Sequence, residues 1–120
     1  MSRPVVIDLF AGAGGLSLGF EQAGFDVRAA VEIDPVHAIV HSYNFPECSV
    51  VTQSIEHVSG DDLVQASNIE AGGEVDALVG GAPCQGFSLI GQRALDDPRN
   101  NLVKDFIRLV REIQPKMFVF

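Results

Sequence analysis

Short apolar runs alternate along the chain with segments in which apolar residues recur at helical spacing. The short runs end at glycine clusters or lie beside proline, as buried strands do. The helical segments begin at capping residues and stop at glycine or proline. Strands are predicted at residues 4–10, 26–31, 49–51, 75–79 and 116–120, and helices at residues 16–23, 35–43, 59–66 and 101–113.

The predicted helices have recognisable ends and apolar sides. Asp34 is expected to cap the helix at residues 35–43, because its side chain can accept N–H groups of the first turn and Pro35 suits the first helical position. The apolar sides consist of Leu16, Phe20 and Ala23 in the first helix, of Val36, Ile39, Val40 and Tyr43 in the second, and of Leu102, Phe106, Leu109, Val110 and Ile113 in the last.

The alternation of strands and helices, with strands that are apolar almost throughout, predicts an α/β fold with a doubly wound, mostly parallel sheet. A length of 120 residues fits one domain. In such sheets, ligands bind beyond the carboxyl ends of the strands. Two glycine clusters, at residues 12–15 and 80–81, follow the first and fourth strands on that edge. The candidate site is therefore expected there.

Residues 10–15 (Phe-Ala-Gly-Ala-Gly-Gly) connect a strand to a helix, and their glycines allow the backbone to turn sharply and approach a ligand. Glu32 follows Gly12 by twenty residues, at the end of the second strand, where a carboxylate can accept both hydroxyl groups of a ribose. This pairing indicates an adenosine-type cofactor. The alternative is a turn that only packs a helix against a strand, with Glu32 in solvent.

The glycine pattern differs from the nicotinamide-binding fingerprint, because the third glycine of that fingerprint would fall at Ser17. Asp8, near the end of the first strand, would repel a diphosphate but suits a cationic ligand. S-Adenosylmethionine carries an ammonium and a sulfonium group. It fits this charge pattern better than NAD does.

The two cysteines differ in their surroundings, and they form neither a disulfide framework nor a zinc-like pattern with histidine, so no metal site is expected. Cys48 lies next to a predicted strand and is interpreted as a small core residue. Cys84 follows a strand, two glycines and Pro83, on the edge where ligands bind. A thiolate at that position is a candidate nucleophile.

Two long motifs make the chain resemble the cytosine-C5 DNA methyltransferases. They lie at residues 8–20, beginning Asp-Leu-Phe-Ala-Gly-Ala-Gly-Gly, and at residues 80–88, Gly-Gly-Ala-Pro-Cys-Gln-Gly-Phe-Ser. The resemblance implies a Rossmann-like S-adenosylmethionine-dependent methyltransferase fold, of which residues 1–120 supply the first five strands, the N-terminal half of a catalytic domain. Further agreement lies at Glu32, Tyr43-Asn44-Phe45-Pro46, Asp97-Pro98-Arg99, Leu102 and Ile113-Gln114-Pro115-Lys116.

The resemblance implies that Cys84 adds to carbon 6 of a cytosine flipped out of the duplex, after which carbon 5 attacks the sulfonium methyl group. Loss of the carbon-5 proton and of the thiolate then restores the ring. Pro83 and Gln85 flank the nucleophile and complete the catalytic set. The implied contacts to DNA are Gln85 and Ser88, in a loop that closes on the duplex, and Arg93 and Arg99 near phosphates.

By the same resemblance, Phe10 contacts the adenine, Glu32 holds the ribose, and Ile33 and Ile55 pack on the faces of the base, while Gly12 allows close approach. The full set of implied S-adenosylmethionine contacts is Phe10, Ala11, Gly12, Ala13, Gly15, Leu16, Glu32, Ile33, Ser54, Ile55, Gly81, Pro83 and Leu102.

The chain departs from the family pattern at two places. Ser54 stands where the family commonly has an aspartate that accepts from the adenine amino group, and a neutral hydroxyl accepts that bond more weakly. After the strand at residues 116–120, the family continues into Glu-Asn-Val, whose glutamate binds the cytosine. The resemblance implies that the target-recognition domain and the C-terminal motifs are absent as well. The chain is expected to be inactive alone, either as a fragment or as one piece of a split enzyme that associates with a second chain or with itself.

The formal net charge of −8 is unevenly distributed. Residues 1–76 contain twelve acidic and two basic residues, whereas residues 77–120 contain four acidic and six basic ones. A phosphate-facing surface is therefore expected in the second part, around Arg93, Arg99 and Lys104. Three other cations, Arg108, Arg111 and Lys116, are interpreted as solvent-exposed side chains on the outer face of the last helix and just after its end.

No apolar run is long enough to span a bilayer, and no signal peptide is recognised. We expect a cytoplasmic enzyme of the restriction-modification type that acts on double-stranded DNA, close to the nucleoid in a bacterium. Three alternatives stay open. One is a non-catalytic adenosine-ligand or DNA-associated binding module of the same fold. Another is a small nicotinamide oxidoreductase, which Ser17 disfavours. The third is a tRNA-methylating relative, which Gly86-Phe87-Ser88 disfavours by family resemblance.

Overall fold

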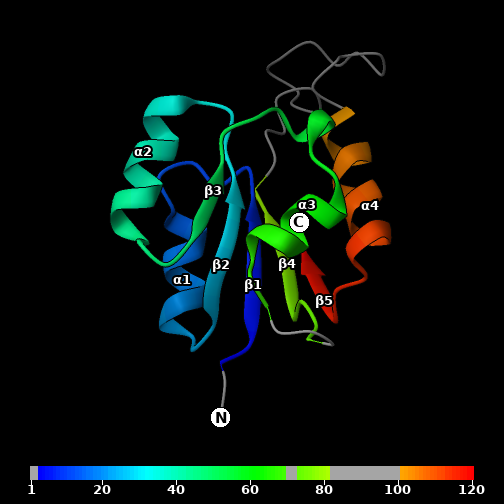
Figure 1. The fold of residues 1–120 in the computed structure, drawn as a ribbon, viewed down its shortest axis with the longest axis horizontal. Helices are drawn as coiled ribbons and strands as arrows, with labels where there is room; N and C mark the ends of the chain where they lie inside the picture. Colours follow the sequence, from blue (N-terminus) through cyan, green and yellow to red (C-terminus); the bar gives the residue numbers. More distant parts are fainter. Residues whose placement is uncertain (1–2, 70–72, 82–100) are drawn as a thin grey trace, which may run out of the picture.

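The computed structural model describes residues 3–69, 73–81 and 101–120, which form a five-stranded sheet with helices on both sides (Figure 1). The strand order is β3-β2-β1-β4-β5, and every neighbouring pair is parallel. The chain starts in the middle and moves first to one edge and then to the other, as in doubly wound folds. The strands are β1 Val5–Leu9, β2 Asp26–Val31, β3 Ser49–Val51, β4 Ala77–Gly80 and β5 Met117–Val119.

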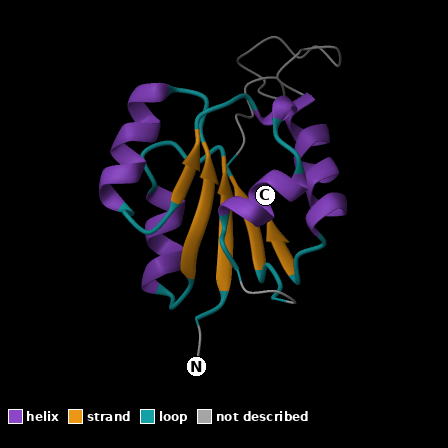
Figure 2. Cartoon of the chain, in the orientation of Figure 1, coloured by secondary structure: helices purple, strands orange, loops and turns teal. Residues whose placement is uncertain are grey.

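Helices α1 and α2 pack on one face of the sheet, and α3 and α4 pack on the other (Figure 2). Right-handed crossovers explain this division, because the winding direction reverses after β3. No helix within residues 3–69, 73–81 and 101–120 is both long and apolar enough to cross a membrane. The helices are α1 Gly15–Gln22, α2 Pro35–Asn44, α3 Gly60–Ala66 and α4 Asn101–Ile113, with one 3₁₀ turn, η1 Ile55–His57.

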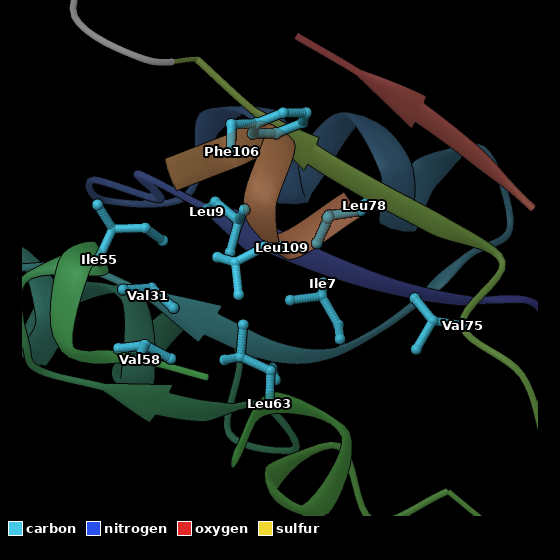
Figure 3. Close-up of a cluster of buried hydrophobic side chains, with 11 residues drawn as sticks. Ile7, Leu9, Val31, Ile55, Val58, Leu63, Val75, Leu78, Phe106 and Leu109 are labelled. Atoms are coloured by element: carbon cyan, nitrogen blue, oxygen red, sulfur yellow. The ribbon is translucent and has the colours of Figure 1, made fainter. Parts of the chain in front are cut away.

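Successive residues of β1 point to opposite faces and enter two separate apolar cores. Ile7 and Leu9 pack with Phe106 and Leu109 in the core beneath α3 and α4 (Figure 3). Val6 belongs to the core beneath α1 and α2. Because helices cover both faces, β1 is apolar almost throughout, and the same holds for β4.

The predicted elements are confirmed, and the fourth strand, which begins at Ala77, shows the largest displacement of an end. The predicted cap of α2 is confirmed as well, since the Asp34 carboxylate accepts from the N–H groups of Val36 at 2.8 Å and His37 at 3.4 Å. The 3₁₀ turn η1 was not predicted, because a single turn has no periodic pattern of apolar residues.

The apolar side of α2 does not pack on the sheet as its pattern suggests, and that of α1 does so only in part. In α2, Ile39 and Tyr43 are 70% and 86% exposed, whereas His41 is fully buried. In α1, Phe20 packs against the core beneath the helices as predicted, whereas Leu16 is 38% exposed and Ser17 is 1% exposed. Ser17 Oγ lies 2.9 Å from His41 Nε2, so a buried polar contact between the helices determines which sides turn inward.

Cys48 is 8% exposed and belongs to the core beneath α1 and α2. Burial, with the nearby charge of Asp8 as a smaller cause, raises the pKa of its thiol to about 12. A thiol with so high a pKa is protonated at neutral pH and is a poor nucleophile. The interpretation of Cys48 as a core residue is confirmed.

Candidate cofactor-binding site

A cavity of about 290 Å³ opens beyond the carboxyl ends of β1, β2, β3 and β4. It lies where the winding direction reverses between β1 and β4, the usual ligand position in such sheets. Apolar side chains and a few polar groups form its wall, as in most small-molecule sites. The lining residues are Phe10, Val31, Glu32, Ile33, Gln53, Ser54, Ile55, Gly81 and Leu102. The structure thus brings most of the predicted cofactor contacts into one cavity.

Glu32 joins the glycine loop to the start of α2. Its Oε1 accepts from the N–H of Gly12 at 2.8 Å, and its Oε2 accepts from the N–H of Asp34 at 2.7 Å. The residue is 9% exposed, so the alternative in which Glu32 is solvated is wrong. Each carboxylate oxygen can accept a second hydrogen bond. The side chain is therefore fixed at the cavity wall and can still accept two hydroxyl groups.

Phe10 forms another wall and has an unusual backbone conformation. Its φ of 54° lies in the left-handed region, which costs a residue with a side chain about 1–2 kcal/mol. The ring lies against Gly80, where an added Cβ would meet Phe10 Cδ2 at 3.2 Å and the Leu9 carbonyl oxygen at 3.0 Å. The close packing at Gly80 places the aromatic ring at the cavity, and strain of this kind is frequent at ligand sites.

The glycine loop is a tight turn that hydrogen bonds hold to the sheet. The N–H of Ala11 donates to the Val31 carbonyl at 2.9 Å, and the N–H of Gly14 donates to the Ala11 carbonyl at 3.1 Å. Gly12 has a φ of +57°, and no heavy atom of the described residues lies within 4 Å of a Cβ added there. The loop thus presents an open stretch of backbone beside Glu32.

Some predicted contacts lie outside this cavity. Ala13 and Gly15 line a neighbouring hollow of about 360 Å³, on the side of α1 and α2. Ala11, within the loop, is 7% exposed, and Leu16, directly after it, is 38% exposed; neither belongs to the cavity lining. The predicted set therefore divides between the cavity and the loop behind it.

The wall after β3 comes from Gln53, Ser54 and Ile55. Ile55 is 3% exposed and packs in the same core as Val31 (Figure 3). The Ser54 hydroxyl makes no capping bond to η1 among the described residues, so it is not used by the turn that follows it. Sequence reasoning missed Val31 and Gln53, and the only signal for them was their position next to Glu32 and Ser54.

Asp8 does not face the cavity. Its Oδ2 accepts from the Ser17 hydroxyl at 2.5 Å, and Ser17 in turn contacts His41 at 2.9 Å. Asp8 is 1% exposed. Burial raises its pKa to about 6, and burial lowers the pKa of His41. The expectation that Asp8 meets a cationic ligand is therefore not met, and the residue instead joins β1 to both helices beneath the glycine loop.

The charge and shape of the cavity indicate which part of a ligand it can hold. Among the described residues that line it, Glu32 is the one charged side chain. A carboxylate repels a diphosphate and suits hydroxyl groups or a cation. Phe10, Ile33 and Leu102 offer an apolar slot of the kind that holds a planar base. These groups fit an adenosine, the part that S-adenosylmethionine and NAD have in common.

The predicted nucleophile and most of the predicted DNA contacts belong to a segment between β4 and α4. Lys104 is exposed near the start of α4. The other predicted residues of this group lie outside the described residues: Pro83, Cys84, Gln85, Ser88, Arg93 and Arg99.

The three cations that were interpreted as solvated differ in the structure. Arg111 is exposed, and Lys116 lies 3.1 Å from Asp76 at the surface. Arg108 is different, because its Nη2 donates to the Ile55 carbonyl at 2.9 Å. The interpretation is wrong for Arg108, since its partner is a backbone group far away in the sequence that no residue pattern reveals.

A parallel sheet of this order, with an acidic side chain at the end of its second strand beside a glycine loop, is typical of Rossmann-like folds, a class that includes the S-adenosylmethionine-dependent methyltransferases. Within this class, the chain belongs to the family of C-5 cytosine-specific DNA methylases, which it matches over residues 5–120. The resemblance found in the two sequence motifs is thereby confirmed.

Several relatives are Type II methyltransferases. The chain is 60% identical over 120 residues to M.XorII of Xanthomonas oryzae pv. oryzae, and the aligned region covers 100% of this chain and 28% of that protein. It is 47% identical over 116 residues to M1.HphI of Haemophilus parahaemolyticus, with 94% of this chain and 30% of that protein covered. It is 43% identical over 115 residues to M.AquIA of a Picosynechococcus species, with 95% and 46% covered. The chain thus spans less than half the length of each.

Solved structures agree with this assignment. A protein assigned as a DNA modification methyltransferase of an Escherichia coli prophage has a TM-score of 0.78 and 43% identity, over 96% of this chain and 30% of that chain. A mutant of Spodoptera frugiperda DNMT2 has a TM-score of 0.64 and 26% identity, over 92% and 32%. The predicted Rossmann-like methyltransferase fold is confirmed.

Proposed function

We propose that the chain is the N-terminal part of the catalytic domain of a DNA (cytosine-5-)-methyltransferase. The enzyme transfers a methyl group from S-adenosylmethionine to carbon 5 of cytosine in double-stranded DNA. The observation that carries the proposal is the position of the Glu32 carboxylate, which the N–H groups of Gly12 and Asp34 hold at the cavity wall. The other described residues that line the cavity are uncharged. Membership of the family supports cytosine as the target base.

The cavity residues have separate roles in this proposal. Glu32 accepts the two ribose hydroxyl groups through the lone pairs that its backbone partners leave over. Phe10 and Leu102 enclose the adenine base together with Ile33, and the Ser54 hydroxyl accepts from the adenine amino group. S-Adenosylmethionine, when bound, supplies an electrophilic methyl group on a sulfonium sulfur.

Cys84 is the proposed nucleophile. Its thiolate adds to carbon 6 of the flipped-out cytosine, which makes carbon 5 electron-rich enough to take the methyl group. Removal of the carbon-5 proton and expulsion of the thiolate then restore the aromatic base and regenerate Cys84. Pro83 and Gln85 flank this residue as members of the proposed catalytic set, and the proposed DNA contacts are Gln85, Ser88, Arg93 and Arg99.

Further polypeptide is proposed to complete the enzyme, because the chain spans 28% and 30% of two of its relatives. At the β5 edge of the sheet, Phe118 and Phe120 are 58% and 51% exposed. Exposed strand edges with large apolar side chains tend to pair with other chain segments. The remainder of a longer chain, or a second chain, would supply the target-recognition domain. We place the complete enzyme in the cytoplasm, next to the nucleoid in a bacterium.

Duplex DNA that contains 5-fluorocytosine should become covalently attached to the complete enzyme in the presence of S-adenosylmethionine. Fluorine at carbon 5 is not lost as a proton is, so the thioether at carbon 6 persists. Random-sequence duplexes avoid the need to know the target site. The adduct is measured by gel electrophoresis under denaturing conditions and located by mass spectrometry of the Cys84 peptide.

The Cys84→Ser variant should give no adduct, whereas Cys48→Ala should still give it because Cys48 lies in the core. An equal yield of adduct from Cys84→Ser would contradict the proposed nucleophile. Methyl transfer to DNA without any adduct would indicate methylation of an exocyclic amino group instead of carbon 5.

The Glu32→Gln variant should bind S-adenosylmethionine at least about tenfold more weakly than the unaltered chain. The amide has the shape of the carboxylate but only one acceptor oxygen, so the N–H of either Gly12 or Asp34 would face an NH₂ group. Glu47→Gln, before the amino end of β3, removes the same charge far from the cavity and should leave affinity within about twofold. Titration calorimetry measures both, and equal weakening would show an effect of net charge alone.

A further inference from the structure

Arg108 joins the middle of α4 to residues 54–60, a segment that begins at the cavity wall with Ser54 and Ile55. Its Nη2 donates to the carbonyl oxygen of Ile55 at 2.9 Å, across 53 positions of the sequence. Its Nη1 donates to Glu112 Oε2 at 3.1 Å, and its Nε donates to Asp105 Oδ1 at 3.4 Å. The side chain is 33% exposed. Contacts in three directions hold the planar guanidinium group in one orientation.

The segment that Arg108 contacts has few hydrogen bonds of its own. In η1, the N–H of His57 donates to the Ser54 carbonyl at 3.0 Å, and the N–H of Val58 donates to the Ile55 carbonyl at 3.2 Å. A single 3₁₀ turn has poor hydrogen-bond geometry and depends on its surroundings. The contact from Arg108 therefore helps to determine where the Ser54 hydroxyl lies on the cavity wall.

Glu112, one turn further along α4, holds Gly60 at the other end of residues 54–60. Its Oε1 accepts from the N–H of Gly60 at 2.7 Å, while Arg108 occupies its Oε2. The helices approach so closely that a Cβ added to Gly60 would meet Glu112 Cβ at 2.6 Å. The N–H of Gly60 and then Arg108 hold the pKa of Glu112 below its usual value, so the carboxylate is charged at neutral pH. Both ends of the segment are thus attached to two α4 side chains that also bind each other.

We propose that Arg108, supported by Glu112, is a positioning residue that gives the cavity its preference for adenine over a purine base without the 6-amino group, by fixing the backbone of Ser54 and Ile55. The inference rests on the proposed binding of S-adenosylmethionine. The same helix supplies Leu102 to the cavity lining. Helix α4 therefore contributes one apolar side chain to the cavity and also holds the segment that carries Ser54.

The chemical reason is the narrow range of distances over which hydrogen bonds discriminate. A hydrogen bond to the edge of a base requires about 2.7–3.2 Å between donor and acceptor. A site built to bond one polar group rejects an analogue without that group far more strongly than an apolar site does. Adenine has an amino group at carbon 6 where unsubstituted purine has only hydrogen, so unsubstituted purine would leave the Ser54 hydroxyl without a partner at the edge that it is proposed to contact. Hypoxanthine is not a suitable comparison, because a hydroxyl can also donate to its carbonyl.

The test compares, by titration calorimetry, the affinities of S-adenosyl-L-homocysteine and of its analogue with unsubstituted purine in place of adenine. The full chain should prefer the adenine compound, and Arg108→Gln should reduce the ratio of the two affinities by about tenfold. Arg108→Lys should restore part of the ratio, because an ammonium group can still donate to the Ile55 carbonyl. Arg111→Gln removes the same charge from an exposed position on the same helix and should leave the ratio unchanged. A general loss of stability would weaken both ligands equally and would not alter the ratio.

The outcomes separate this inference from the proposed function. If the unaltered chain discriminates and Arg108→Gln discriminates equally well, the inference is overturned and the function stands. If the unaltered chain binds neither compound, the proposed cofactor site is wrong, and amide hydrogen exchange decides the inference. Exchange at His57 and Val58 should then rise about tenfold in Arg108→Gln but not in Arg111→Gln. Unchanged exchange at both amides would overturn the positioning role.

Discussion

Replacement of Gly14 by alanine is expected to lower the free energy of unfolding by about 3 kcal/mol or more. Gly14 precedes α1 with a φ of +108°, which residues with a side chain rarely adopt, and an added Cβ would overlap the ring of Phe45 and lie 3.1 Å from His41 Cδ2. Phe45 is 5% exposed, so its ring cannot move into solvent without loss of core packing. The strained backbone costs about 1–2 kcal/mol and the overpacking about 1–3 kcal/mol.

Gly19, in the same helix, offers a matched control. No heavy atom of the described residues lies within 4 Å of a Cβ added at Gly19. Gly19→Ala should therefore stabilise the chain by about 0.5–1 kcal/mol, because alanine favours a helix interior over glycine. Urea denaturation of the full chain measures both variants. Equal stabilities for the two variants would contradict the close packing of Gly14 against Phe45.

Replacement of Asp8 by asparagine is expected to remove a pH dependence of stability of about 3 kcal/mol. Burial raises the pKa of Asp8 from 3.8 to about 6, so between these pH values the folded chain binds more protons than the unfolded chain. The contribution of Asp8 to the free energy of unfolding therefore falls as the pH rises from about 4 to about 6, and it stays low above that range. Asparagine does not ionise, and its carbonyl oxygen can still accept from the Ser17 hydroxyl.

The measurement is the difference between the unfolding free energies of the unaltered chain and of Asp8→Asn, from about pH 4 to about pH 8. His41 contributes with the opposite sign, because burial lowers its pKa and the stability it adds is lost as the pH falls below 6.5. His41 is present in both proteins, so the difference isolates Asp8. Asp8→Asn should gain relative stability as the pH rises to about 6, whereas Glu47→Gln should run parallel to the unaltered chain. A parallel curve for Asp8→Asn would show that Asp8 titrates normally.

Part of the candidate site was predictable because it depends on strand ends. Gly12 and Glu32 lie at the carboxyl ends of two parallel strands, which meet at one edge of the sheet, and the structure places them 2.8 Å apart, from N–H to carboxylate oxygen. The interpretation of Arg108 as a solvated cation failed for the opposite reason. Its partner is a backbone carbonyl 53 positions away, and every residue type has such a carbonyl, so the sequence has no signal for the contact.

The sequence by itself determined the kinds, order and approximate ends of the strands and helices, because burial on both faces of a sheet and the capping of helices leave local patterns. Only the tertiary structure decided which sides of α1 and α2 face the sheet. Their inward sides carry Ser17 and His41 while Leu16 and Tyr43 are exposed. A buried carboxylate at Asp8 without a hydrogen-bond donor would cost more free energy than these apolar side chains could recover by burial. The polar partner of one strand residue, and not the apolar stripe, therefore determined how the helices pack.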